Sequence, residues 1–555
     1  MPKRHWANRL ILILIAILNM AFSSGVSPAS GLDPQPASES NPPPGPDRFS
    51  VIAVEYTSYE WHLLTWKDKK FVCSIVVDHE GMPLPGEVYR DCGTLIYQKW
   101  ITQPPCTIHD VSRCDGYYAL LINSEEKEKE IALELPAASA WVSLEDCEPV
   151  YSASTNVCEI QPTLVIQGME PLPNESINRI EGTYEGQAFS CADTDICKFR
   201  IPETDEDGAT VQFWSYSTYG DSSIVYDAQV RVKIVDEGDP DQLYWYVDVL
   251  SSQWQGEVLA SCSDSWQVFP PVGGAPEWLS TPNDSEELSS DIPYTYLAAN
   301  LILQGVVDAD SCPDGGLAPG NVVNQCGLEK SRDAVAAWQN QFDELIVTTA
   351  RETGVPARLL KNLFARESQF WPGIYQAIGD VGLGQLTENG ADTALFWNRS
   401  FFNQFCPLVM DSETCGMGYA NLDEELQAEL RRALVGSVNA DCEECPLGFD
   451  LTQADFSVGV FAHTMLANCE QAGQVIYNYT GKSPGEAASY EDLWKFTLVN
   501  YNAGGGCLAE AVSAANGISG LPLTWETVSP NLAGVCSAAV DYVNDISGQV
   551  STPAP

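Results

Sequence analysis

Hydrophobic and polar positions alternate along much of residues 49–272. In the runs 230–234 and 243–249, hydrophobic residues, most of them β-branched or aromatic, occupy every second position, with charged residues or tyrosines between them. A period of two is typical of β-strands whose two faces differ in burial. Clusters of Asp, Glu, Gly and Pro at 205–208 and 237–240 separate the runs and are typical of turns. The pattern therefore predicts a β-rich N-terminal half.

We predict two β-sandwich-like modules in this half, residues 49–165 and 166–272. Both are rich in Trp and Tyr, whose rings either fill a core and pair across strands or stack on sugars. We expect the first use for most of these rings, and carbohydrate contact by the modules is the alternative. The rings concerned are Trp61, Trp66, Trp100, Trp214, Tyr216, Tyr219, Trp245 and Trp254.

The hydrophobic spacing changes to a helical period further along the chain. Residues 273–292 are rich in Pro, Gly, Ser and acidic residues, which predicts a linker. Beyond it, residues 334–349, 456–467 and 493–501 show the spacing of amphipathic helices. We therefore predict a multidomain chain in which the all-β modules are followed by a mainly α-helical domain over 293–555.

One predicted helix, residues 356–367, carries an acid on its hydrophobic face. Its sequence begins with Pro, which suits the first turn of a helix. The face is formed at positions i, i+3, i+4 and i+7 by Leu360, Leu363, Phe364 and Glu367. A carboxylate buried among hydrophobic neighbours raises its pKa and keeps its proton. General acid catalysis at a glycosidic bond requires such a group, and the alternative is a structural pair between Glu367 and an Arg.

Three motifs follow one another from this helix onward. They are Glu367-Ser-Gln-Phe-Trp-Pro372, Gly382-Leu-Gly-Gln-Leu386 and Asn500-Tyr-Asn-Ala-Gly504. They resemble the soluble lytic transglycosylase family of the lysozyme superfamily, which carries Glu-Ser-x-Phe-x-Pro, Gly-Leu-Met-Gln-Leu and Tyr-Asn-Ala-Gly elements. The gap between the first two motifs also matches that family. The resemblance covers the C-terminal part of the chain only.

The resemblance implies a lysozyme-like fold for residues 293–555. It also implies cleavage of the β-1,4 bond between N-acetylmuramic acid and N-acetylglucosamine in peptidoglycan, with a 1,6-anhydro-muramoyl product. Glu367 would be the catalytic acid and then the base for the C6 hydroxyl, and neither a cofactor nor a metal is implied. The residues implied to bind the substrate or steady the site are Ser368, Gly382, Leu383, Gln385, Tyr501 and Asn502.

Two features depart from the family pattern. Gly384 stands where the family has Met, which predicts more room or more backbone freedom beside Gln385. The stretch from Thr387 to Asp455 is longer than usual in the family and contains four cysteines. We expect this insertion to line, cover or narrow the cleft, and therefore to affect the preferred substrate length rather than the chemistry.

The choice of reaction depends on whether a second carboxylate is present. Ordinary retaining or inverting glycosidases need one at a defined separation from the acid. Asp380, Glu388 and Asp392 lie near Glu367 in sequence, and none of them is compellingly placed. The alternatives to a lytic enzyme are a lysozyme-type hydrolase of peptidoglycan or chitin and a non-catalytic cell-wall-binding surface protein.

Charge restricts the choice of partner. Lys and Arg number 28 against 76 Asp and Glu, so the formal net charge is −48. Such a field repels nucleic acid, which excludes a nucleic-acid partner. We expect peptidoglycan glycan strands as the partner, bound by sugar and peptide contacts. The sequence contains no phosphate-binding Gly-Lys loop, no His-Glu-x-x-His and no dinucleotide fingerprint.

The N-terminus has the pattern of an export signal. Basic residues precede a hydrophobic run at 10–22 that is short for a membrane span and suits a signal peptide, which we predict over 1–24. An uncleaved membrane anchor is the alternative. The Pro- and Ser-rich residues 25–48 predict an extended linker. We therefore expect an exported protein, extracellular or associated with the cell wall.

Cysteine usage agrees with export. The chain has 18 cysteines, nine on each side of residue 300, and a high even count in an exported chain indicates disulfides. If every cysteine pairs, at least one bridge joins the two halves. The short loops Cys191–Cys197 and Cys312–Cys326 are plausible bridges. For Cys442-Glu-Glu-Cys445 we expect a structural disulfide rather than a zinc site, since the chain has only 5 His.

Overall fold

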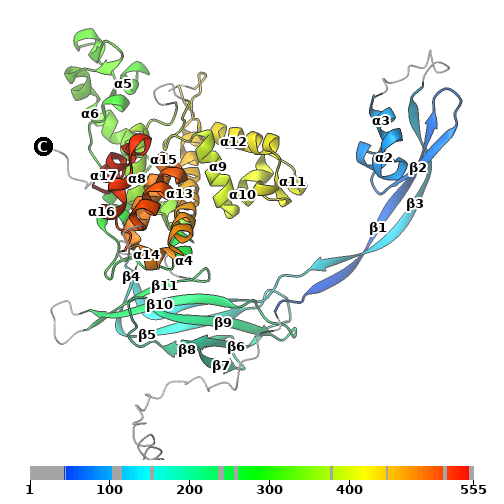
Figure 1. The fold of residues 1–555 in the computed structure, drawn as a ribbon, viewed down its shortest axis with the longest axis horizontal. Coiled ribbons are helices and arrows are strands. Elements are labelled where there is room, and N and C mark those ends of the chain that lie inside the picture. The colour runs from blue at the N-terminus through cyan, green and yellow to red at the C-terminus, as the bar shows by residue number, and fades with distance from the viewer. Residues whose placement is uncertain are drawn as a thin grey trace, which may run out of the picture. The chain divides into compact units, whose positions relative to one another are not determined.

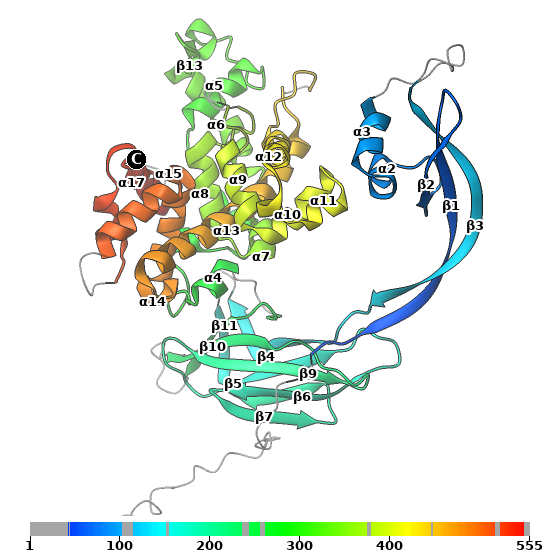
Figure 2. The ribbon, with the colours of Figure 1, turned by 45° about the vertical axis from the view of Figure 1, so that its right-hand side comes forward.

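We analysed a computed structural model of the chain, shown as ribbons in Figures 1 and 2. The structure describes residues 43, 45–102, 115–150, 155–235, 243–255, 261–374, 379–445, 448–516 and 522–548. It divides into two compact units. The hairpin unit is Pro44–Ala137 with Pro171–Asn174, and the main unit contains Ala138–Glu170 and Glu175–Pro555.

The hairpin unit is built on a three-stranded antiparallel sheet in the order β2-β1-β3. A small core beneath the sheet contains Leu63, Ile75, Val77 and Val88, and the disulfide Cys73–Cys92 ties a strand to a helix. The elements are β1 (Phe49–Thr65), β2 (Phe71–Val77), α2 (Pro85–Cys92), α3 (Thr94–Thr102) and β3 (Tyr117–Glu134).

The main unit begins with an eight-stranded antiparallel sheet. Its order is β4-β5-β11-β10-β9-β6-β7, and β8 also pairs with β5. All eight strands contribute to one hydrophobic core, so the sheet curves around that core. The strands are β4 (Ser139–Val150), β5 (Thr155–Met169), β6 (Ile177–Tyr184), β7 (Gln187–Ala192), β8 (Ile196–Arg200), β9 (Ala209–Ser217), β10 (Tyr226–Val235) and β11 (Tyr244–Leu250).

The β-rich N-terminal region is confirmed, but it is arranged differently from the expected pair of sandwich-like modules. Residue 165 lies inside β5, which pairs with β4 and β8 on its two sides, so no module boundary falls there. The change from one sheet to the other lies between β3 and β4. Alternation identifies strands without identifying their partners, and for this reason the sequence did not locate this change.

Most aromatic rings of the two sheets are used in packing. Trp214 is 4% exposed, and Trp61, Trp100, Trp245 and Trp254 pack partly buried against the cores of the two sheets. Trp66 pairs with Tyr118, and the Arg179 guanidinium lies over the Tyr216 ring. Tyr219 is 39% exposed. The expected packing role therefore holds for most of the rings named from the sequence.

The rest of the main unit is mainly helical, as predicted, and has a single large core. The α-helices are α4 (Ser261–Trp266), α5 (Thr295–Leu303), α6 (Gln325–Asn340), α7 (Asp343–Thr353), α8 (Ala357–Ser368), α9 (Glu388–Trp397), α10 (Arg399–Phe405), α11 (Ser412–Gly416), α12 (Glu424–Val438), α13 (Leu451–Thr480), α14 (Pro484–Ala487), α15 (Tyr490–Asn516), α16 (Trp525–Val528) and α17 (Ala538–Gly548). Short 3-10 turns and the two-residue strands β12 (Leu317–Ala318) and β13 (Val322–Val323) connect them.

Two long helices form the centre of this region. In α13, the Asp450 side chain caps the first turn, and Gly481 ends the helix at φ 69°. α15 packs along α13, and its helical geometry breaks at Gly504, which has φ 83°. The predicted segments 456–467 and 493–501 lie inside these two helices. The predicted helix 334–349 is divided between α6 and α7.

Residues 273–292 are packed against the helical core instead of forming a linker. Trp278, Leu279 and Leu288 are buried in the helical core, on 3-10 turns at Glu277–Leu279 and Ser285–Leu288. The Ser280 carbonyl accepts a hydrogen bond from the Arg358 backbone at 3.2 Å. Pro, Gly and Ser are abundant here because the segment turns repeatedly, and composition alone does not distinguish a packed turn-rich segment from a free linker.

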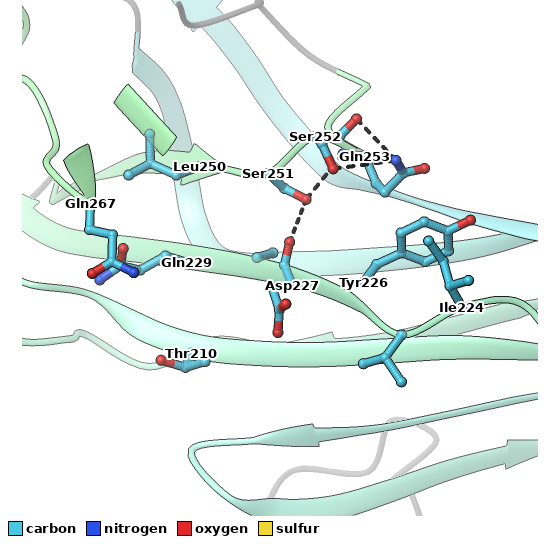
Figure 3. A pocket seen from close by; sticks show the side chains of 12 residues that line it. Thr210, Ile224, Tyr226, Asp227, Gln229, Leu250, Ser251, Ser252, Gln253 and Gln267 are labelled. Carbon is cyan, nitrogen blue, oxygen red and sulfur yellow. Dashed lines mark hydrogen bonds between the residues drawn. The ribbon is translucent and has the colours of Figure 1, made fainter. Parts of the chain in front are cut away.

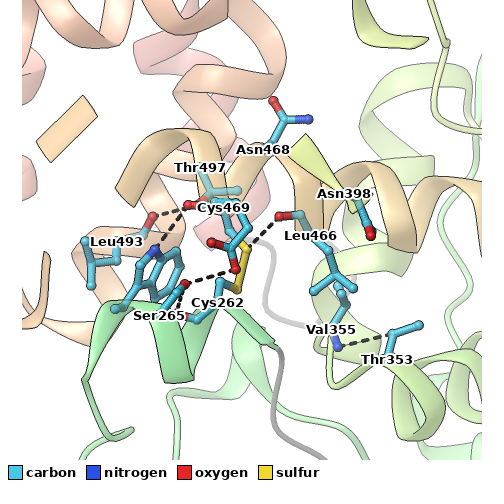
Figure 4. The surroundings of a disulfide bond; sticks show 12 residues. Cys262, Ser265, Thr353, Val355, Asn398, Leu466, Asn468, Cys469, Leu493 and Thr497 are labelled. Atoms are coloured by element: carbon cyan, nitrogen blue, oxygen red, sulfur yellow. Dashed lines mark hydrogen bonds between the residues drawn. A yellow bond between two sulfur atoms is a disulfide. The ribbon is translucent and has the colours of Figure 1, made fainter. Parts of the chain in front are cut away.

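A disulfide joins the two halves of the sequence, as the cysteine count required. Cys262 of α4 pairs with Cys469 of α13 (Figure 4). The Trp266 indole donates to the Cys469 carbonyl at 3.1 Å. Eight disulfides are present among the described residues, and this number is consistent with a secreted protein. The others are Cys73–Cys92, Cys147–Cys158, Cys191–Cys197, Cys312–Cys326, Cys406–Cys415, Cys442–Cys445 and Cys507–Cys536.

The predicted signal peptide, residues 1–24, lies outside the described residues, as does most of the predicted linker 25–48. Within the described part of the chain, no helix combines the length and the hydrophobicity needed to span a membrane.

Candidate active site

Glu367 lies in a cleft of about 380 Å³ in the helical region. The cleft is formed by the end of α8, the turn before α9, the first turns of α9, and the facing sides of α13 and α15. Its lining residues are Glu367, Asp380, Gln385, Leu386, Thr387, Asn389, Gly390, Thr393, Thr464, Asn468, Asn500, Tyr501, Asn502, Ala503 and Gly504. The three sequence motifs therefore meet at one place.

The Glu367 carboxyl group is partly buried, and its pKa lies near neutral pH. Burial raises its pKa to about 7, and the negative charge of Asp380 acts in the same direction. The hydrogen bond from the Tyr542 hydroxyl to Glu367 Oε1, at 2.5 Å, and the charge of Arg366 partly oppose this rise. Among the described residues, Glu367 forms no ion pair. Burial of an unpaired acid is therefore the main feature of the site.

Ser368 fixes the end of α8 against the turn that follows it. Its hydroxyl donates to the Leu383 carbonyl at 2.7 Å, and its side chain is fully buried. After Ser368 the backbone turns sharply, since Gln369 and Phe370 both have positive φ. Ser368 is not among the cleft-lining residues, so its observed contact is with the turn at Leu383.

The second motif forms a tight turn beneath one side of the cleft. Gly382 has φ 77°, and a Cβ there would lie 2.7 Å from the Val438 carbonyl oxygen, so only glycine fits. Leu383 is buried in the core. Gln385 also has positive φ, and its amide donates to the Gly382 carbonyl at 2.7 Å. Of these three residues, Gln385 lines the cleft.

Gly384 does not leave free space beside Gln385, contrary to the expectation from the sequence. A Cβ at this position would lie 2.5 Å from the ring of Phe461 on α13. Phe461 is fully buried and also packs edge-on against Phe364 of α8. The ring fills the volume that a larger residue at 384 would need, so the two positions are complementary in size.

The third motif brings Tyr501 and Asn502 to the cleft from α15. The Tyr501 hydroxyl donates to the Gly384 carbonyl at 2.5 Å and so joins the second and third motifs. Burial and the nearby carboxylates hold the pKa of Tyr501 well above its ordinary value, so this hydroxyl remains a donor. Asn502 is exposed and lines the cleft.

The insertion 387–455 contributes a wall of the cleft. It folds into α9 to α12, and its first residues line the cleft through Thr387, Asn389, Gly390 and Thr393. The Thr387 side chain caps α9 by accepting from the Gly390 backbone at 2.9 Å. The insertion was expected to line, cover or narrow the cleft, and in the structure its first residues line it.

The three acids near Glu367 in sequence have different surroundings. Asp380 lines the cleft, and burial raises its pKa. Glu388 is not among the lining residues. Asp392 accepts hydrogen bonds from Tyr419 at 2.6 Å and Arg431 at 3.1 Å, which hold α9 against α12. Asp380 is therefore the acid that shares the cleft with Glu367.

Sequence reasoning did not identify Tyr542. Its hydroxyl is the donor to Glu367, and the two residues lie 175 positions apart. A usable signal was present, because α17 buries Ala539, Tyr542, Val543 and Ile546 on one face. Tyr542 is the polar-tipped residue on that face, just as Glu367 is the acid on the buried face of α8.

A larger cavity, of about 790 Å³, lies on the eight-stranded sheet against β9, β10 and β11 (Figure 3). Its lining includes Tyr226, whose pKa is raised by burial, and Asp227, whose carboxylate accepts from the Gln212 amide at 2.9 Å. Across the described residues, no group of three or more His, Cys, Asp or Glu side chains is placed to hold a metal ion.

Comparisons with models of known protein families, with curated proteins and with solved structures found no match to this chain.

Proposed function

We propose that the protein is an exported peptidoglycan lytic transglycosylase that cleaves the bond between N-acetylmuramic acid and N-acetylglucosamine. The observation that carries the proposal is a partly buried Glu367 in a cleft, without an ion pair among the described residues and with a pKa of about 7. A carboxyl group with this pKa is largely protonated at mildly acidic pH and still ionises readily, which suits a residue that first gives and then takes a proton.

In the proposed reaction, Glu367 donates its proton to the glycosidic oxygen as the bond from that oxygen to the muramoyl C1 breaks. The C6 hydroxyl of the same muramoyl unit then bonds to C1 and loses its proton to the Glu367 carboxylate. The 1,6-anhydro ring closes, and the acid is restored without a water molecule. The Tyr542 hydroxyl stabilises the transient carboxylate by donating to Oε1.

One observation favours a second candidate, a hydrolase of peptidoglycan or chitin. Asp380 lies in the same cleft, and its negative charge raises the pKa of Glu367. A second carboxylate in this position would serve as the base that activates water. The two candidates differ in the end group of the product, which is an anhydro ring for the lytic enzyme and a reducing end for the hydrolase.

The deciding experiment is mass spectrometry of the soluble products released from purified peptidoglycan. We expect anhydro ends, which are lighter than hydrolytic products by one water. Glu367→Gln should lower the rate by about 10²–10⁴-fold, which is typical of losing a general acid. The matched control is Glu344→Gln at an exposed position on α7, which should leave the rate unchanged.

Other outcomes separate the alternatives. Reducing ends would favour the hydrolase and would identify Asp380 as the residue to replace next. Retention of the protein on insoluble peptidoglycan without any product would favour the non-catalytic wall-binding protein. Substantial activity in Glu367→Gln would show that Glu367 is not the acid.

A further inference from the structure

A row of polar side chains lies between α13 and α15 at the cleft. Thr464, Asn468 and Asn500 all line the cleft, and all three are almost fully buried. The Asn468 amide donates to the Thr464 carbonyl at 2.8 Å, which leaves Asn468 Oδ1 facing α15 as an acceptor. Two buried asparagines are costly between helices unless their polar atoms find partners.

The Asn500 amide has one defined orientation. Its Nδ2 donates to Asn468 Oδ1 at 2.9 Å, to the Asn468 carbonyl at 3.2 Å and to Gln471 Oε1 at 2.9 Å. Rotating the amide by half a turn would place its oxygen against these three oxygens. Nδ2 is therefore held toward α13, and Oδ1 is held on the opposite side.

Asn500 Oδ1 is the buried atom that this arrangement leaves without a hydrogen-bond donor. The residue is 2% exposed, and no donor among the described residues reaches Oδ1. An unpaired buried acceptor costs about 1–3 kcal/mol, so a native protein seldom keeps one without a use.

The glycines after the third motif control access to Oδ1. The helix breaks at Gly504, which itself lines the cleft. A Cβ on Gly505 would lie 3.2 Å from Asn500 Oδ1 and 3.2 Å from Gln471 Nε2, whereas a Cβ on Gly506 would meet nothing within 4 Å. A side chain at 505 would therefore crowd the acceptor, and the same side chain at 506 would not.

We propose that Asn500 Oδ1 accepts a hydrogen bond from the acetamido N–H of an N-acetylated sugar, which makes Asn500 a specificity-determining residue of the cleft. An acetamido N–H that leaves water needs an acceptor, and Oδ1 is a neutral acceptor without a donor. The lining also suits a neutral group, since it contains two acids, several amides and hydroxyls, and no Lys or Arg. This assignment rests on the proposed glycan-cleaving function.

The test compares two β-1,4-linked hexasaccharides that differ only at C2, namely chitohexaose with acetamido groups and cellohexaose with hydroxyls. Binding is measured by calorimetry in the Glu367→Gln background, so that neither sugar is cleaved. Adding Gly505→Ala should weaken chitohexaose binding by about 10-fold, the order expected for one hydrogen bond, and leave cellohexaose binding unchanged. Adding Gly506→Ala should change neither. Asn500→Ala should reproduce the selective loss, provided that its melting temperature matches the parent's.

Three results would overturn the assignment. An equal loss for both sugars would mean that Oδ1 serves a hydroxyl, or that position 505 acts by general crowding. No loss for either sugar would mean that Asn500 only joins the two helices. If the Glu367→Gln parent binds neither sugar, the proposed glycan cleft itself fails, and that failure is distinct because it appears before any change at 505 or 500.

Discussion

Each end of α8 carries an ionisable side chain that is at least partly buried. The energetic cost of removing each charge from water is offset by a different kind of partner. Near the start, Lys361 lies within hydrogen-bond distance of both Asp343 carboxylate oxygens, at 2.7 and 2.9 Å. At the end, Glu367 has the neutral hydroxyl of Tyr542 and, in the described part of the chain, no ion pair. The eight-stranded sheet repeats the first arrangement, with Arg231 bonded to Asp248 at 2.6 Å.

This contrast separates structural buried charges from an acid that can react. An ion pair satisfies both charges in place, so it holds elements together and has no proton to give. A carboxyl group that has only a neutral partner keeps its proton until the pH approaches 7, and so can donate it to a substrate. The same helix thus joins α7 through Lys361 and presents an acid through Glu367.

Breaking the ion pair between Lys361 and Asp343 should have the largest effect on stability. Lys361→Met leaves the Asp343 carboxylate buried without a cation, which costs about 3–5 kcal/mol. We expect a melting temperature lower by several degrees, measured by circular dichroism. The rate per folded molecule should be unchanged, because Lys361 does not line the cleft.

The control for this variant removes both charges. Asp343→Leu with Lys361→Met leaves no unpaired charge and should recover most of the lost stability. If the double variant is as unstable as the single one, the loss of stability comes from packing. The ion pair between Lys361 and Asp343 would then not be what stabilises this part of α8.

Replacing the unpaired acid should have the opposite effect on stability. Because folding raises the pKa of Glu367 from 4.5 to about 7, its favourable contribution is fully present below pH 4.5 and is lost as the pH rises through 7. Glu367→Gln removes this loss and should stabilise the protein at pH 8 by about 1–3 kcal/mol, at about 1.4 kcal/mol per pKa unit. Melting curves of both proteins at pH 4 and pH 8 measure it. An equal shift at both pH values would argue against a raised pKa.

The local part of the site was predictable from the sequence. Hydrophobic spacing alone places Glu367 on the buried face of a helix, and that helix is α8. The two long central helices and the strands at 230–234 and 243–249 were predictable in the same way. These features depend on residues within a few turns of one another, where periodicity carries the information.

The parts that escaped prediction depend on distant residues. The small residue at Gly384 leaves room for the ring of Phe461. The hydrogen-bond donor to Glu367 is Tyr542, 175 positions away. The position of the change between the two sheets is set by the strands that β5 pairs with, which alternation does not specify. In each case, hydrophobic spacing does not specify which residues distant in sequence pack against one another in the fold.

Replacing Tyr542, the neutral partner of Glu367, should raise the pKa of the Glu367 carboxyl group. The hydrogen bond from Tyr542 lowers the pKa of Glu367, so Tyr542→Phe should raise it further. The alkaline limb of the pH–rate profile should move to higher pH, and the maximal rate should fall about tenfold, since one charge-assisted hydrogen bond is lost. Tyr477→Phe, at an exposed position on α13, is the matched control. A lower rate without movement of the limb would limit Tyr542 to packing.

The smallest effect should come from the second acid of the cleft, and it should have the opposite sign. The negative charge of Asp380 raises the pKa of Glu367, so Asp380→Asn should lower it. The alkaline limb should then move to lower pH by less than about one unit, since Asp380 contributes less than burial does. Glu388→Gln removes a charge nearby in sequence but outside the cleft lining, and should leave the limb in place. If Asp380→Asn instead abolishes turnover at every pH, Asp380 takes part in the chemistry, and the hydrolase becomes the better description of the enzyme.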